Sequence, residues 1–257
     1  MNDIDRIISS ILEEDNEPKK YNALFIPRRV ESRFERIKAI LQQKHIDGDL
    51  DLGYLPITDL GNLESITGDL DLSDTPITSL GFLKLVGGDL NLSRTYITDL
   101  GSLESIEGNL LLYDTRVKSL GSLKSIGGSL YLQGGDSITP ITNLGSLESV
   151  GGDLDLRYAP ITSLGSLRSV GGNLDLSFSF ITSLGSLESV GKSLILHDTS
   201  ITSLGSLKSV GGNLFLYNTP ITNLGSLKTV GLIIIGKDSK LDVDSLPEHF
   251  KDKIVIE

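Results

Sequence analysis

The stretch that decides the fold of this chain is Gly68-Asp-Leu-Asp-Leu-Ser-Asp-Thr-Pro-Ile-Thr-Ser-Leu-Gly-Phe-Leu-Lys-Leu-Val-Gly87. Near-copies of it fill most of the 257 residues, and its first glycine recurs every 20 residues from Gly48 to Gly128. The period resumes at Gly152 after one step of 24 residues, and Lys192 once replaces the glycine. Self-similarity at this spacing is typical of a solenoid, in which each turn buries its apolar face against its neighbours.

Each repeat is predicted to contain one short strand of the Leu70-Asp71-Leu72 type. Side chains alternate between the two faces of a strand, so both leucines are expected inside and Asp71 outside. We therefore expect a mainly β fold, a right-handed single-chain parallel solenoid whose nine repeats span residues 48–230. Further inward positions complete about six apolar side chains per turn, and in this repeat they are Ile77, Leu80, Leu83 and Val86.

Residues 1–47 depart from the repeat and are expected to form a helical amino-terminal cap. Isoleucines and a leucine spaced three and four apart predict one amphipathic helix over residues 3–13. A second helix should begin after Pro27, with Ile37 and Leu41 on its apolar side. Such a cap covers the core and the open strand edge of the first turn. An alternative stays open, in which the arginines of the second helix dock an acidic partner.

Residues 231–257 also depart from the repeat and are expected to form a carboxy-terminal cap. Leu232–Ile235 and Ile254–Ile256 are predicted to be strands, with Ser245–Phe250 as a turn of helix between them.

The composition limits the class of protein. The chain is 39% apolar but only 5% aromatic, so its core must be aliphatic. It contains no cysteine, which favours a reducing compartment, and it shows neither a secretory leader nor an apolar run long enough to cross a membrane. We expect a cytoplasmic protein. The net charge of −11 lies in the repeats and argues against a nucleic-acid partner, whose binding site would be basic.

One column of residues supports direct stacking of the turns. The sign of the side-chain charge alternates from each repeat to the next, and only Lys228 breaks this alternation. Stacked turns would place each charge between two opposite charges, which favours one register. The column reads Glu64, Lys84, Glu104, Lys124, Glu148, Arg168, Glu188 and Lys208.

The outward strand positions vary, and a partner could select among them. Apolar residues form a central patch of Leu111, Tyr113 and Tyr131, and a terminal patch of Ile195, Phe215 and Tyr217. Such exposed clusters are typical of protein interfaces. The carboxy-terminal cap could instead cover the terminal patch. The predicted binding residues are Leu111, Tyr113, Tyr131, Asp155, Arg157, Asp175, Ile195, His197, Phe215 and Tyr217. The column that ends in Tyr217 is expected to point outward throughout. Its other members are Gly53, Ser73, Ser93, Gln133 and Ser177.

The amino-terminal end of the same face is acidic. Asp49, Asp69 and Asp89 are expected to stack, as are Asp51 and Asp71. A solvated face is the favoured interpretation; a basic partner or a bridging Ca²⁺ ion are the alternatives.

Catalysis is not expected. Asp155, Asp175 and His197 lie on neighbouring turns, and paired carboxylates are what glycosidases use. However, the regular turns leave no long loops for a substrate groove, and the single insertion, Gln133–Ile138, is short. No cofactor or metal motif is present.

The repeat resembles the leucine-rich repeat, with Leu70, Leu72, Thr75 and Ile77 on the core pattern of that family. The Val-Gly-Gly-Asp-Leu stretch at 86–90 is also similar to the receptor L-domain, and the short Gly-Asp-Leu-Asp-Leu and Thr-Pro-Ile-Thr repeats resemble uncharacterised repeat proteins of bacteria and phages. The resemblance implies a binding protein without shared catalytic residues.

We expect a non-enzymatic scaffold that binds a protein partner. If the origin is a phage or a bacterium, the partner would be a host or competitor factor to be neutralised. The alternative is a glycan-binding or surface-binding protein. The oligomeric state is left open, with a monomer favoured.

Overall fold

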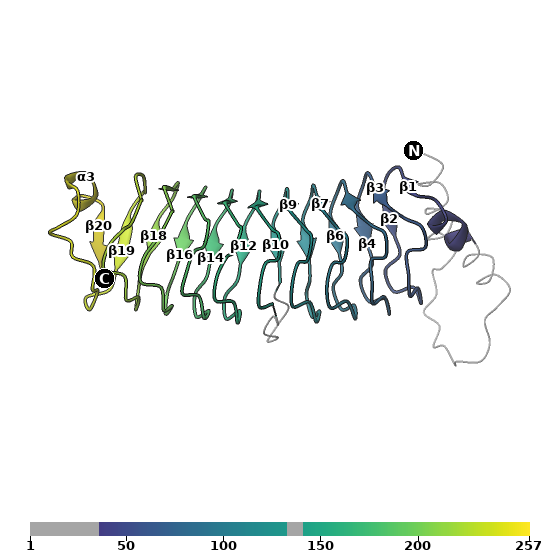
Figure 1. Cartoon of the computed structure of the whole chain (residues 1–257), viewed down its shortest axis with the longest axis horizontal. Coiled ribbons are helices and arrows are strands. Elements are labelled where there is room, and N and C mark those ends of the chain that lie inside the picture. The colour runs from purple at the N-terminus through teal and green to yellow at the C-terminus, as the bar shows by residue number, and fades with distance from the viewer. Residues whose placement is uncertain (1–35, 133–140) are drawn as a thin grey trace.

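The chain folds into a mainly β parallel solenoid of about ten turns, each of about 20 residues. The structure is a computed structural model that describes residues 36–132 and 141–257. The turns follow one another along the long axis, from β1 (His45–Ile46) near one end to β20 (Ile254–Ile256) near the other (Figure 1). The prediction of a mainly β parallel solenoid is thereby confirmed.

Sheet B, the larger of two parallel sheets, contains the predicted Leu-x-Leu strands. Each strand pairs with the same segment of the next turn, as Leu70 does with Leu90. The register steps by 24 residues only where Leu130 meets Leu154, across the insertion. In the described residues its eleven strands are β2 (Leu50–Asp51), β4 (Leu70–Asp71), β6 (Leu90–Asn91), β8 (Leu110–Leu111), β10 (Leu130–Tyr131), β12 (Leu154–Asp155), β14 (Leu174–Asp175), β16 (Leu194–Ile195), β18 (Leu214–Phe215), β19 (Ile233–Ile235) and β20 (Ile254–Ile256).

Sheet A is a second parallel sheet, so the prediction of one strand per turn was incomplete. Its strands end two residues before the position that begins each repeat, and a two-residue strand is too short to show a period-two pattern. In the described residues its nine strands are β1 (His45–Ile46), β3 (Ser65–Ile66), β5 (Leu85–Val86), β7 (Ser105–Ile106), β9 (Ser125–Ile126), β11 (Ser149–Val150), β13 (Ser169–Val170), β15 (Ser189–Val190) and β17 (Ser209–Val210).

The core runs as one continuous aliphatic column inside the turns. The six apolar positions predicted for each repeat are buried; in the quoted repeat, Leu70 is 1% exposed and Leu72 is 0% exposed. Burying one such side chain contributes about 1.5–3 kcal/mol, and the repetition supplies this term at every turn.

A ladder of side-chain oxygens joins the turns beside sheet B. Asp49 accepts the backbone N–H of Asp69 (2.8 Å), and Asp69 accepts that of Asp89 (2.6 Å). The acidic stack is therefore a structural element as well as a face that solvent reaches, since Asp49 and Asp69 are exposed. The same bond recurs toward the carboxy terminus from Asp89, Asn109, Ser129, Asp153, Asn173, Ser193 and Asn213.

Replacing a ladder residue should separate the role of the oxygen from that of the charge. Asp89→Ala leaves the N–H of Asn109 without its acceptor at 2.6 Å and should lower the free energy of unfolding by about 1–2 kcal/mol. Asp89→Asn keeps the acceptor and removes one of three stacked negative charges, so it should cost less or stabilise. Urea unfolding followed by circular dichroism compares the two variants. Equal midpoints would show that the ladder bond is unimportant.

A glycine column keeps neighbouring turns close at the corner before sheet A. Gly165 and Gly185 both adopt a left-handed φ, +59° and +58°, which residues with a Cβ adopt at a cost. Their surroundings differ. A Cβ at Gly165 would have no atom within 4 Å, whereas a Cβ at Gly185 would lie 2.6 Å from the carbonyl oxygen of Gly165.

This pair of glycines allows a matched test of close approach. Gly165→Ala should cost about 1–2 kcal/mol, the price of a left-handed φ for an L-residue. Gly185→Ala carries the same backbone cost and also forces two backbones apart, so it should cost at least about 1 kcal/mol more. The measurement is the urea midpoint of each variant. A Gly165→Ala variant as unstable as Gly185→Ala would contradict the prediction.

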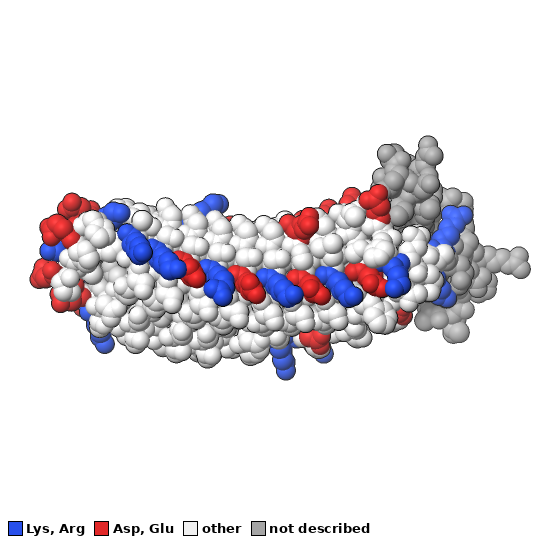
Figure 2. All heavy atoms as spheres, turned by 45° about the horizontal axis from the view of Figure 1, so that its top comes forward, with Lys and Arg blue, Asp and Glu red and all other residues white. Residues whose placement is uncertain are grey.

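The alternating charge column forms a ladder on the surface, as predicted. Figure 2 shows alternating positive and negative side chains running along the solenoid. Lys124 lies 3.3 Å from Glu104, and Arg168 lies 3.5 Å from Glu188, which also pairs with Lys208. Lys44, which precedes the predicted column, extends it by pairing with Glu64 at 2.6 Å.

The ladder should make stability depend on pH. Hydrogen bonding to Lys208 lowers the pKa of Glu188 below its ordinary 4.5. A lowered folded pKa contributes stability that is present above 4.5 and is lost as the pH falls through the folded value. The urea midpoint of the wild type should therefore fall more steeply on acidification than that of Glu188→Gln. High salt should shrink this difference; parallel pH profiles at low salt would contradict it.

The two ends depart from the repeat. Most of the predicted amino-terminal cap, including the 3–13 helix, lies outside the described residues. Residues 36–41 are helical, and Ile37 and Leu41 are buried as expected. At the other end, β19 and β20 flank the short helix α3 (Glu248–Lys251).

Candidate functional site

The ten predicted binding residues all follow the outer face of sheet B. None of the ten is buried, so the structure leaves this face accessible. It brings them together in three groups along the solenoid: the central patch, a charged group around Arg157, and the terminal patch.

The central patch is a contiguous apolar cluster. Leu111 and Tyr131 are register partners on β8 and β10, and the ring centroids of Tyr113 and Tyr131 lie 6.1 Å apart. Tyr131 is 39% exposed, and burial raises the pKa of Tyr113. The predicted outward position Gln133 falls outside the described residues.

The charged group is held together by one arginine. Arg157 binds the Asp155 carboxylate through Nε (2.9 Å) and Nη2 (2.6 Å), and its Nε lies 3.8 Å from Asp175. The hydrogen bond to Asp155 is the main cause of the raised pKa of Arg157. Both carboxylates therefore interact with the guanidinium of Arg157. The arrangement is a cluster of paired charges and not a free general acid beside a free general base.

The terminal patch packs partly against the cap. His197 lies between Phe215 and Tyr217, with ring centroids 5.8 Å and 4.8 Å away. The hydroxyl of Tyr217 donates to the Glu257 carboxylate, which raises the pKa of Tyr217 to about 12. The next outward residue, Ile234, is only 5% exposed. The cap thus extends this patch and covers part of it.

Ser73, Ser93 and Ser177 were predicted outside but are buried, at 4–5% exposed. The strands end two residues earlier, and the residue after each serine turns with a positive φ, for example 57° at Asp74. The hydroxyl of Ser177 donates to the outward carboxylate of Asp175 (2.6 Å), so this serine keeps the outward direction although solvent does not reach it at the start of the corner.

That corner carries aromatic residues that sequence analysis missed. Tyr158 and Phe178 occupy the positive-φ position, at 58° and 59°, and their rings stack at 5.0 Å with an interplanar angle of 6°. They are 50% and 46% exposed, and the neighbouring Phe180 is 67% exposed. The available signal was their departure from the Asp or Asn that four other repeats have at this position, at Asp74, Asp114, Asp198 and Asn218; Tyr54 and Arg94 depart from it as well.

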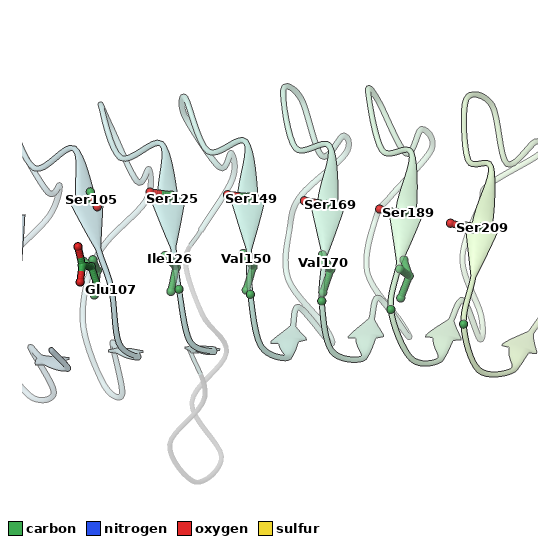
Figure 3. A pocket seen from close by; sticks show the side chains of 17 residues that line it. Ser105, Glu107, Ser125, Ile126, Ser149, Val150, Ser169, Val170, Ser189 and Ser209 are labelled. Atoms are coloured by element: carbon green, nitrogen blue, oxygen red, sulfur yellow. The ribbon is translucent and has the colours of Figure 1, made fainter. Parts of the chain in front are cut away.

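The outer face of sheet A is hollowed into a shallow open groove of about 640 Å³. Serines from successive strands line it in a row, as Figure 3 shows for Ser105 to Ser209. Glycines follow them two residues later, for example Gly151 and Gly171. The groove therefore presents a row of small serine side chains. It does not bring a set of catalytic groups together.

Among residues 36–132 and 141–257, no cluster of three or more histidines or acidic residues is placed to hold a metal ion. The stacked aspartates instead use an oxygen each to accept a backbone N–H. The calcium alternative therefore has no support from this geometry.

The comparisons with known proteins do not place the chain in a family: no family model, curated protein or solved structure matches it. Within the described ranges, none of the helices has the length and apolar character that crossing a bilayer requires.

Proposed function

We propose that this chain is a non-enzymatic scaffold that binds a protein partner through the outer face of sheet B and its adjoining corner. The observation that carries the proposal is the stacked pair Tyr158 and Phe178, two aromatic residues at a backbone position where four other repeats have Asp or Asn.

These aromatic residues do not serve the scaffold. A bulky residue with positive φ is a rare and costly choice, whereas Asn and Asp adopt that conformation more readily. The rings lie about half exposed outside the core, so they gain little from burial in the free protein. Burial against a partner would supply the hydrophobic stabilisation that the two rings lack in the free protein. Aromatic residues dominate the energetics of such interfaces.

The corner aromatics adjoin one of the predicted patches. Phe178 donates its backbone N–H to the carbonyl of His197 (2.9 Å), so the corner adjoins the terminal patch. Tyr131 and Phe215 lie four strands apart, about 19 Å at the usual strand spacing. That length suits a standard interface of about 800 Å² per partner.

The outer face of sheet A offers less to a protein partner. Its groove is lined mainly by serines and glycines, with Glu107 and several buried isoleucines and valines, beside a ladder whose charges neutralise one another. The contrast between the two faces favours sheet B.

The test is affinity capture with the tagged full chain, comparing the wild type with the double variant Tyr158→Asn and Phe178→Asn. Asn suits the positive φ, so the variant should stay folded and lose at least tenfold in captured partner. Tyr131→Asp and Phe215→Asp probe the two patches. Phe82→Ser is the matched control, because Phe82 is 64% exposed but lies outside sheet B and its corner, where other repeats have serine. Identical partners for all folded variants would refute the proposal.

The proposal also includes the finer predictions made from the sequence, which concern the type of repeat, the compartment and the kind of partner. The resemblance of the repeats to a right-handed leucine-rich-repeat solenoid of bacterial or phage type supports a cytoplasmic binding protein that neutralises a host or competitor factor.

Glycan binding is the second candidate. Stacked exposed rings beside the Arg157 and Asp155 pair are a surface that a sugar ring can contact. Retention of the wild type on a polysaccharide array, lost in the Tyr158→Asn and Phe178→Asn variant, would favour it over a protein partner.

A further inference from the structure

The strand β20 has an open edge. In the described part of the chain it is the last strand of sheet B and pairs with β19 alone. Lys253 accepts the N–H of Ile233 (2.8 Å), and Glu257 donates its N–H to Ile235 (3.1 Å). In a parallel pair, alternate residues of an edge strand bond to the neighbour. The backbone groups of Ile254 and Ile256 therefore point away from β19, and no described residue outside that pairing bonds to them.

The cap leaves this edge uncovered on its inner side. Ile256 is the register partner of Ile235, which is 2% exposed, yet Ile256 is 59% exposed. Leu246 and Phe250 of the cap are themselves buried and do not cover it. An apolar edge strand that lacks an inward charge or a proline is suited to pairing with another strand.

The edge is complementary to itself. Residues 253–257 read Lys-Ile-Val-Ile-Glu. An antiparallel second copy centred on Val255 places Lys253 opposite Glu257 and Ile254 opposite Ile256, and both pairings occur twice. The free backbone groups of Ile254 and Ile256 then form two hydrogen-bonded pairs, and Val255 faces its own copy across the two-fold axis. Such an axis generates a closed dimer with one surface used twice.

We propose that β20 is a homodimer interface, in which two copies pair antiparallel about Val255 and join their B sheets end to end. Lys253 also donates to the carbonyl of Val230 (2.7 Å), and Glu257 accepts from Tyr217. An ammonium has three donors and a carboxylate two oxygens, so each can also bind across the dimer. The interface is short, and its dissociation constant should be about micromolar or weaker. It does not depend on the binding function proposed above.

The first test is the mass of the full chain by light scattering over a range of concentrations. The wild type should rise from 27.7 kDa toward twice that mass. Ile256→Pro removes an N–H that points away from β19, so it should spare the fold and weaken the dimer at least tenfold. Ile256→Val keeps the N–H and is the matched control. A wild type that stays monomeric at every soluble concentration overturns the proposal.

The second test concerns the register. Lys253→Glu should weaken the dimer because it places two carboxylates opposite each other, and adding Glu257→Lys should restore it. Rescue by the charge swap requires these two residues to face each other across copies. A dimer unaffected by Lys253→Glu and Ile256→Pro would be formed elsewhere and would also overturn the proposal.

The third test uses the absence of cysteine from the natural sequence. Facing residues of a non-hydrogen-bonded antiparallel pair have Cα atoms about 4.5 Å apart, within the range of a disulfide. Val255→Cys should therefore form a covalent dimer under mild oxidation, and Ile256→Cys should do so much less, since that residue faces Ile254. Equal or absent cross-linking of the two folded variants contradicts the register.

Discussion

Close stacking of successive turns is the constraint on which the rest of this structure depends. Two parallel sheets, the aspartate, asparagine and serine ladder and the charge ladder all join residues one turn apart. Each bond is modest, about 1 kcal/mol for a hydrogen bond and less for an exposed ion pair. They all specify the same register, and a slip of one residue would turn the core leucines toward solvent.

Stacking also explains why so much of the sequence is fixed by the scaffold. A polar residue in a repeat protein invites a functional interpretation, yet Asp69 and Asp89 each accept a backbone N–H from the next turn. For the proposed binding function, the candidate residues are those whose departures from the repeat bring no gain to the core. Tyr158 and Phe178 are the clearest, because they also occupy an unfavourable backbone conformation.

The two ends of the solenoid differ from its middle, because a terminal turn has a neighbouring turn on one side only. At the amino-terminal end, the N–H of Asn62 bonds to the carbonyl of Leu41 (2.8 Å), so the helical segment takes the place of a preceding turn. At the carboxy-terminal end, the cap buries Phe250 but leaves the edge of β20 open. In the described residues β2 and β20 are the two edge strands of sheet B, and the pairing of two copies proposed above uses the edge of β20.

The sequence by itself determined the repeat length, the inward leucines of strands such as β4 and the alternating charge ladder, because these follow from spacing alone. It did not reveal sheet A, the burial of Ser73 or the ladder bonds of Asp69, since two-residue strands carry no pattern and such bonds join residues one turn apart. The corner aromatics were also missed, because the exposure of Phe178 depends on a positive φ that only the folded corner imposes. Tertiary structure decided which repeated polar residues belong to the scaffold, and so which surface is left for a partner.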